Sequence, residues 1–195
     1  FSLTFTINNS NIDDSKNGGE NMSSIDLVIL GIVMEKPQSA YDIQKDVEYH
    51  HLSRWTKISV PSIYRKVLQM NEQGYLESSI VKGDKFADKA VYSITEKGQT
   101  YFGQLMETYA SQEIPLLFDF NVVIANLNKM DREKAFNLIN KLRDNITASV
   151  NSIDEYAASY PDIPLGGKAI FEQQRLLYQS LLEWLDKFES HFKGS

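Results

Sequence analysis

The stretch "SVPSIYRKVLQMNEQGYL", residues 59–76, holds the features that decide the fold. Ser59 is placed to cap a helix, Pro61 falls in the first turn, and Gly74 stands just past the last turn. The stretch therefore predicts one helix with a defined start and a defined end. No acidic residue occurs from Tyr49 to Asn71, although the whole chain has a formal net charge of −6.

The two sides of this helix differ in character. At about 100° per residue, three apolar side chains fall on one face, which we expect to pack against a core: Ile63, Val67 and Met70. The opposite arc holds four polar side chains: Ser62, Arg65, Lys66 and Gln69. Tyr64 lies between the two faces and can either touch a phosphate or pack.

The acid-free window carries a local positive charge. Its cations are Arg54, Lys57, Arg65 and Lys66, whereas residues 22–102 as a whole carry ten cations and ten acids. Arg and Gln side chains read base edges, and Ser and Lys suit phosphates. A carboxylate in this window would face a dense line of phosphate charge. The pattern predicts a DNA-facing surface; the alternative is a solvated face that happens to lack acids.

The segment before the window predicts two further helices. Ser23 and Asp26 fit a capping box ahead of the apolar run "IDLVILGIVM", which Pro37 ends, and Ser39 and Asp42 fit a second capping box. The apolar run predicts a buried helix, and the second box opens a helix with an apolar face.

The segment after Gly74 predicts a hairpin and another helix. "YLESSIV" and "KAVYSI" read as strands joined by "KGDKFAD", and Thr95 caps the helix that follows. Three helices, a hairpin and a helix form the layout of a winged helix-turn-helix domain, which we assign to residues 22–113. The predicted fold class is mainly α with a small β-hairpin: a winged helix-turn-helix domain followed by an α-helical dimerisation arm, residues 114–195.

The arm predicts two long helices with apolar stripes. Asp131 can cap the first, which runs to about Tyr160; "PDIPLGG" interrupts the chain, and the second begins near Lys168. The stripe of the second helix supplies the predicted dimer contacts: Leu177, Leu181, Trp184 and Phe188. A two-helix hairpin is not expected to bury three further leucines as well, namely Leu176, Leu182 and Leu185. We therefore expect a two-fold homodimer; the alternative is an arm folded back onto its own winged domain.

Residues 1–21 divide into an alternating run, "FSLTFTI", and a polar stretch rich in Gly and Asn. We expect a leader or tail here; the alternative is an added strand that pairs with a partner.

Three segments resemble the PadR-like transcriptional regulators: "LVILGIVMEKPQSAYDIQKDV", "SIY" with Gly74 ten residues later, and "VYSITEKG". The resemblance covers residues 22–102 and implies a cytoplasmic, dimeric repressor that binds a palindromic operator in double-stranded DNA. It also implies a small aromatic effector, for which the aromatic residues of the arm would line a site. The alternative is that these residues only pack in the core or at the dimer contact. Together with the charge pattern it gives the predicted DNA contacts: Lys57, Ser59, Ser62, Tyr64, Arg65, Lys66, Gln69, Lys82, Lys85 and Lys89.

This chain departs from the family pattern at several positions. Ala40 replaces a common Gly, Arg65 replaces a common Pro, and Leu68 and Gln69 stand where the family often has basic residues. The wing lysines are also mixed with Asp84 and Asp88. These features keep open a rival class, a winged-helix protein-interaction module without DNA binding.

The sequence contains few residues that would support a metal site or an enzymatic activity. The chain has no cysteine, and its three histidines include an adjacent pair that cannot share one ion on a helix. No Gly-rich phosphate loop or nucleophile motif occurs. We expect no metal, no cofactor, no enzymatic activity and no membrane segment.

Overall fold

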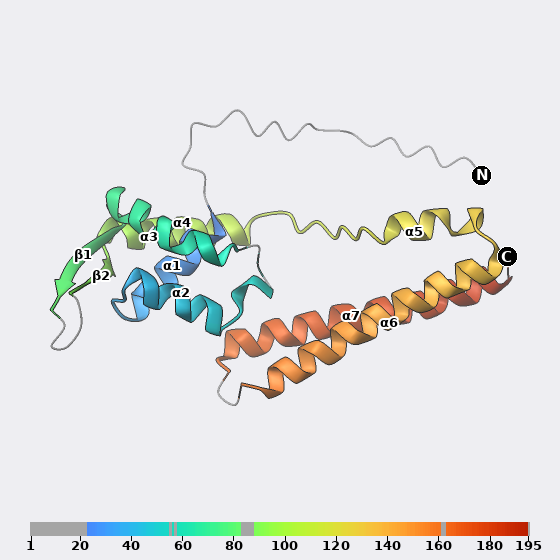
Figure 1. Cartoon of the computed structure of the whole chain (residues 1–195). Helices are drawn as coiled ribbons and strands as arrows, with labels where there is room; N and C mark the ends of the chain where they lie inside the picture. The colour runs from blue at the N-terminus through green and yellow to red at the C-terminus, as the bar shows by residue number, and fades with distance from the viewer. Residues whose placement is uncertain (1–22, 55, 57, 83–87, 161–162, 195) are drawn as a thin grey trace. The chain divides into compact units, whose positions relative to one another are not determined.

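The computed structural model describes residues 23–54, 56, 58–82, 88–160 and 163–194 (Figure 1). The chain divides into two compact units, the first ending at Glu113 and the second beginning at Ile114. The expectation for residues 1–21, like the predicted contacts Lys57 and Lys85, lies outside the described residues.

Within its described residues, the first unit contains four α-helices and a two-stranded sheet, in the order predicted for a winged helix. The elements are α1 (Ser24–Glu35), α2 (Ala40–Tyr49), α3 (Ile63–Glu72), β1 (Leu76–Val81), β2 (Lys89–Ile94) and α4 (Glu96–Ala110). Single 3₁₀ turns at Leu52–Arg54 and Val60–Ser62 connect α2 to α3. The predicted fold class is confirmed.

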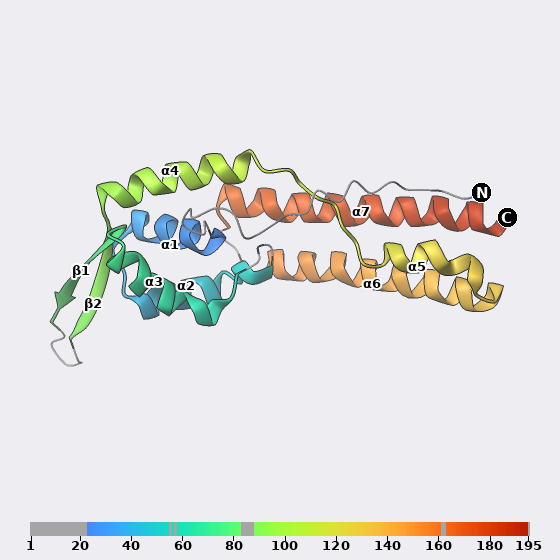
Figure 2. The ribbon, with the colours of Figure 1, turned by 90° about the horizontal axis from the view of Figure 1, so that it is seen from above.

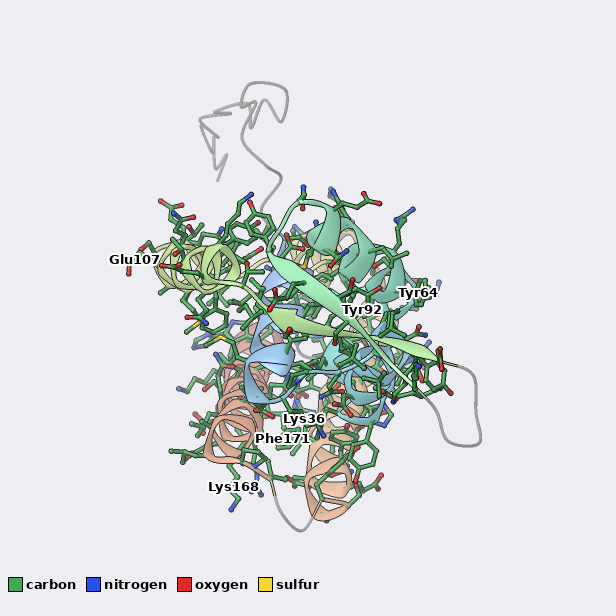
Figure 3. The ribbon with its side chains drawn as sticks, turned by 90° about the vertical axis from the view of Figure 1, so that its left-hand side faces the viewer. Lys36, Tyr64, Tyr92, Glu107, Lys168 and Phe171 are labelled. Atoms are coloured by element: carbon green, nitrogen blue, oxygen red, sulfur yellow. The ribbon has the colours of Figure 1, made fainter. Side chains whose placement is uncertain are left out.

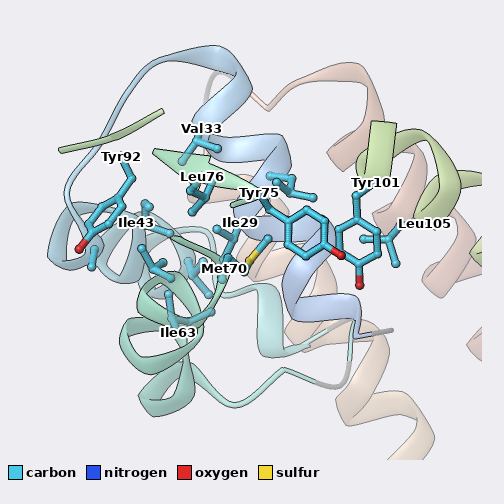
Figure 4. Close-up of a cluster of buried hydrophobic side chains, with 14 of the residues drawn as sticks. Ile29, Val33, Ile43, Ile63, Met70, Tyr75, Leu76, Tyr92, Tyr101 and Leu105 are labelled. Carbon is cyan, nitrogen blue, oxygen red and sulfur yellow. The ribbon is translucent and has the colours of Figure 1, made fainter. Parts of the chain in front are cut away.

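The core of this unit forms where α1, α2, α3, α4 and the root of the hairpin meet (Figure 4). The predicted inner face of α3 is confirmed, because Ile63, Val67 and Met70 are fully buried. Tyr75 stacks on Tyr101 of α4 with ring centroids 4.4 Å apart. Helix α3 is therefore anchored from its apolar side.

The hairpin is antiparallel, with Leu76 opposite Ile94 and Val81 opposite Lys89. Gln38 adds a bridge at its root: the amide nitrogen of Gln38 donates to Tyr92 at 3.1 Å, and that of Tyr92 donates back at 2.8 Å. The link between α1 and α2 is thus hydrogen-bonded to the wing, by which we mean β1, β2 and their turn.

The predicted caps of α2 and α4 are confirmed. Ser39 accepts a hydrogen bond from the Asp42 amide at 3.2 Å, and Thr95 accepts one from the Gly98 amide at 3.0 Å. Ser23 does cap α1, through the Ile25 amide at 3.3 Å. The capping box predicted there is wrong, because the Asp26 carboxylate turns into the protein interior instead of back toward Ser23.

The second unit is a helical hairpin with a short helix before it. Its elements are α5 (Asn121–Asn126), a 3₁₀ turn (Leu127–Lys129), α6 (Arg132–Ala158) and α7 (Leu165–Gly194). Helices α6 and α7 lie side by side and antiparallel (Figure 2). Asp131 precedes α6 but makes no capping bond through its side chain, and its carboxylate pairs with Lys134 at 2.8 Å instead.

The hairpin buries a different part of α7 from the one predicted. Leu185 is fully buried and Leu182 partly buried, so the expectation that the hairpin cannot bury them is wrong. Leu181 and Phe188 also pack against this core, whereas Leu176, Leu177 and Trp184 are exposed by 56%, 45% and 36%. The apolar residues of α7 are thus shared between an internal seam and an outward face. None of the helices described here is long and apolar enough to cross a bilayer.

Candidate nucleic-acid interface

The chain enters α3 through the 3₁₀ turn Val60–Ser62, so the α-helix begins four residues later than Ser59. Neither Ser59 nor Ser62 caps through its side chain, which corrects the predicted role of Ser59. The Ser62 hydroxyl donates instead to the carbonyl of Ser59 at 2.6 Å. Pro61 fits the tight turn because its fixed φ suits the first turn and it has no amide to satisfy.

The end of α3 follows the prediction. Gly74 has φ +77, and two backbone bonds close the helix, from Gly74 to Asn71 at 3.0 Å and from Tyr75 to Met70 at 2.9 Å. This reversal brings Tyr75 directly into the core and starts the wing at Leu76. The orientation of α3 is thereby fixed at its C-terminal end.

Five residues of α3 are exposed: Tyr64, Arg65, Leu68, Gln69 and, in the last turn, Glu72. Tyr64 is about half exposed, and Leu68 is 38% exposed. Tyr64 lies near Tyr92 of β2 at the edge where helix and wing meet (Figure 3). Burial raises the pKa of Tyr92, and the nearby Tyr64 adds to this shift. Glu72 lies two turns after Arg65 on the same side, so this face carries no carboxylate before the last turn of α3, as the sequence predicted.

Lys66 is the exception among the predicted contacts on the helix. Its ammonium lies 3.0 Å from Oδ1 of Asp26, and its side chain is 19% exposed. The expectation that Lys66 shares the exposed arc with Arg65 is therefore wrong in geometry. A helical wheel places only the Cβ atom, and the long lysine stem bends back over the edge of the helix.

The sequence pattern assigned Asp26 to a helix cap and did not indicate its contacts in the protein interior. Asp26 is 3% exposed, and besides Lys66 it accepts a hydrogen bond from the Tyr101 hydroxyl at 3.1 Å. Its charge also helps to raise the pKa of Tyr109, after the larger effect of burial. An acid within an almost wholly apolar helix was the available signal, because a buried carboxylate needs a partner.

The wing offers weaker cationic contacts than the lysine count suggests. Lys82 is exposed at the end of β1, but Lys89 pairs with Asp42 at 3.1 Å. The hydroxyl of Ser39, with a smaller effect of Lys89, lowers the pKa of Asp42. Beside Lys82, two apolar side chains of β1 face solvent, Ile80 (67% exposed) and Val81 (46%). The exposed surface of the described part of the wing is therefore both apolar and basic.

Two groups of aromatic side chains are in ring contact within the described part of the second unit. Tyr156 donates from its hydroxyl to that of Tyr160 at 3.0 Å and packs edge-on against Phe171. Near the other end of the hairpin, Trp184 stacks on Phe188, with ring centroids 5.9 Å apart. Within the described residues, no three His, Asp or Glu side chains gather to hold a metal ion.

Residues 29–104 match the model of the transcriptional regulator PadR-like family. No curated protein matched the chain. Bacillus subtilis PadR in complex with operator DNA is similar in structure, with a TM-score of 0.68 and 16% identity over 89% of this chain and 99% of that one. The PadR-like regulator BC1756 from Bacillus cereus has a TM-score of 0.61 and 21% identity, covering 87% and 98% of the two chains.

The Vibrio cholerae virulence activator AphA is also similar, with a TM-score of 0.60 and 19% identity over 88% of this chain and 99% of that one. At these identities the solved structures establish the fold, and the family match lies over the winged unit. The resemblance read from the sequence is therefore confirmed over residues 29–104, which match the model of the transcriptional regulator PadR-like family.

Proposed function

We propose that this chain is a sequence-specific DNA-binding transcriptional regulator that acts as a dimeric repressor. The observation that carries the proposal is the exposed face of α3, where Arg65 and Gln69 stand on a helix without acids from Tyr49 to Asn71. Both side chains can pair with base edges in a major groove. The similarity to Bacillus subtilis PadR, solved with operator DNA, supports this use of the helix.

A dimer is the second part of the proposal. Leu176, Leu177 and Trp184 leave an apolar face on α7 that the hairpin does not cover. A second copy supplies matching surface, and two-fold symmetry is the commonest closed arrangement. Two copies of α3 would then meet half-sites of a palindromic operator, roughly 34 Å or a multiple of that apart. Repression would follow from occupation of a promoter.

A small aromatic effector is the third part. Bacillus subtilis PadR was also solved with p-coumaric acid, at 15% identity and a TM-score of 0.68. In this chain, the cluster of Tyr156, Tyr160 and Phe171 offers flat apolar surface with two hydroxyls. We propose that a phenolic compound of this kind weakens operator binding. Once operator binding is established, fluorescence anisotropy with and without p-coumaric acid tests this part.

The test of DNA binding uses a labelled fragment from upstream of the protein's own gene. The double variant Arg65→Ala and Gln69→Ala is compared with Lys141→Ala, an exposed cation on α6 that serves as a charge control. We expect the double variant to lose specific binding and the control to bind like the wild type. Equal affinity of all three proteins would exclude α3 as the DNA-contacting helix.

A protein-interaction module is the second candidate function. Leu68 and Tyr64 place apolar surface on the same exposed face, and Leu68 stands where the related family often has a basic residue. Under this reading, wild-type protein would bind no DNA fragment above nonspecific affinity at low salt. The anisotropy experiment therefore separates the two functions directly.

A further inference from the structure

Asp26, Lys66 and Tyr101 form a buried polar cluster in which three helices of the first unit meet. Asp26 lies in the first turn of α1, Lys66 in the second turn of α3, and Tyr101 in the second turn of α4. The Lys66 ammonium is 3.0 Å from Oδ1 of Asp26, and the Tyr101 hydroxyl donates to Oδ2 at 3.1 Å. One carboxylate thus contacts both other helices, through an ion pair with Lys66 and a hydrogen bond from Tyr101.

The other buried side chains of α3 are apolar, and the backbone hydrogen bonds from Gly74 and Tyr75 hold only its C-terminal end. Ile63, Val67 and Met70 are fully buried, but apolar burial is non-directional and tolerates a small roll of the helix. The polar contacts add a more specific constraint, because the Tyr101 hydroxyl donates to Asp26 in a defined direction and the ion pair keeps the Lys66 ammonium 3.0 Å from the same carboxylate. Lys66 is next to Arg65 in the chain, so the direction of one side chain sets that of the other, about 100° away around the axis.

We propose that Lys66 is a positioning residue of the DNA-reading helix and not a phosphate contact. The Asp26–Lys66 ion pair, braced by Tyr101, sets the rotation of α3 so that Arg65 and Gln69 point outward. This inference rests on the proposed function, because it explains how a DNA-reading face would be held. The inference assigns Lys66, one of the two cations of α3, to the ion pair with Asp26 and leaves Arg65 for DNA.

The energetics favour this assignment. If Lys66 swung out toward a phosphate, the carboxylate of Asp26 would stay buried without its cation. Breaking a buried ion pair by removing one partner is strongly destabilising, whereas replacing both partners is often tolerated. A phosphate contact at the surface would not offset such a loss. Lys66 therefore stays with Asp26 when DNA binds.

The experiment compares Lys66→Met, Asp26→Asn and the double variant in urea unfolding and in operator binding across a KCl series. Met keeps the stem without the charge, and Asn keeps the shape of Asp. We expect each single variant to lower the folding equilibrium constant roughly 10²- to 10³-fold, and the double variant to recover most of that loss. Should a single variant not fold, the double variant still gives the binding result.

The binding result distinguishes positioning from simple stabilisation. We expect the folded double variant to bind the operator at least about fivefold more weakly, the scale of one misplaced base contact. The slope of log K against log salt should stay that of the wild type. A phosphate contact at Lys66 would instead reduce that slope by about 0.9. A double variant with wild-type affinity would also overturn the proposal, because the pair would then only stabilise the fold.

Asp26→Asn supplies an internal control on charge. Removing an acid should strengthen DNA binding or leave it unchanged if charge alone mattered, so weaker binding by the folded variant would support positioning. Hydrogen exchange of the α3 amides tests the cluster without DNA. Exchange should quicken in Asp26→Asn and stay unchanged in Arg65→Ala; equal protection in both would overturn the proposal even if no operator were found.

Discussion

Gly98 of α4 lies directly against the main-chain carbonyl of Tyr75, so close that a Cβ at position 98 would overlap this oxygen. The same Cβ would be 2.8 Å from Cγ1 of Ile94. The close approach follows from the cap of α4, because Thr95 donates from its backbone amide to the same carbonyl at 3.1 Å and its hydroxyl accepts from Gly98. The end of α3, the end of β2 and the start of α4 therefore meet at one oxygen.

Gly98→Ala should consequently destabilise the first unit. We expect a loss of about 1–3 kcal/mol, the usual cost of adding a methyl group where no space exists. Gly103→Ala is the matched control in the same helix, since a Cβ there meets nothing within 4 Å. It should stabilise by roughly 0.5–1 kcal/mol through helix propensity. Urea unfolding that ranked the two variants the other way would contradict the packing described here.

The two wing lysines should behave differently toward DNA. Lys82 is exposed, whereas Lys89 is paired with Asp42 and must leave that carboxylate to reach a phosphate. We expect Lys82→Ala to weaken binding to all DNA sequences about equally and to lower the salt slope by about 0.9. Lys89→Ala should change the slope less. Anisotropy on specific and random DNA measures both effects, and a change in base preference would show instead that the wing reads sequence.

The exposed and buried residues of α7 should separate dimerisation from folding. Leu177→Glu places a charge on the outward face, and we expect a folded monomer in sedimentation velocity at micromolar concentration. Leu185→Ala removes a fully buried side chain and should cost about 2–5 kcal/mol of hairpin stability. Dimers that survive Leu177→Glu and Trp184→Glu together would show that this face is not the interface.

The hairpin should lose stability in acid. Arg143 of α6 binds Asp186 and Glu189 of α7, and Lys193 also binds Glu189. Lys193, followed by Arg143, lowers the pKa of Glu189. A carboxyl with a lowered folded-state pKa contributes stability that is present above its unfolded pKa, about 4.3, and lost as pH falls through the folded value.

We therefore expect the melting temperature of wild-type protein to fall below about pH 4.5, with a small contribution from Glu189, under about 1 kcal/mol because the pair is near the surface. Glu189→Gln should show lower stability at pH 7 and a flatter pH profile. A variant whose profile matched the wild type would mean that this pair contributes nothing measurable.

The sequence by itself determined the order of elements in the winged unit. Helix starts and ends depend on residues close in the chain, so they can be predicted without tertiary contacts. The residues concerned here are Ser39, Thr95, Pro61 and Gly74. The inner face of α3 could be predicted equally well, because its apolar residues recur with the helical period of 3.6 and so lie on one side. The absence of carboxylates before Glu72 could also be read directly from the sequence.

Only the tertiary structure decided where Lys66 and the leucines of α7 point. Lys66 pairs with Asp26, which lies forty positions earlier in the chain. The flexible lysine stem allows the ammonium to reach either side of the helix, so the helical period does not determine its position. On α7, apolar residues at 176, 177, 181, 182, 184, 185 and 188 cover more than one face, so their spacing allows several seams. The partner helix α6 selects Leu185 for burial and leaves Leu177 exposed, because packing against a specific neighbour sets the rotation that periodicity leaves open.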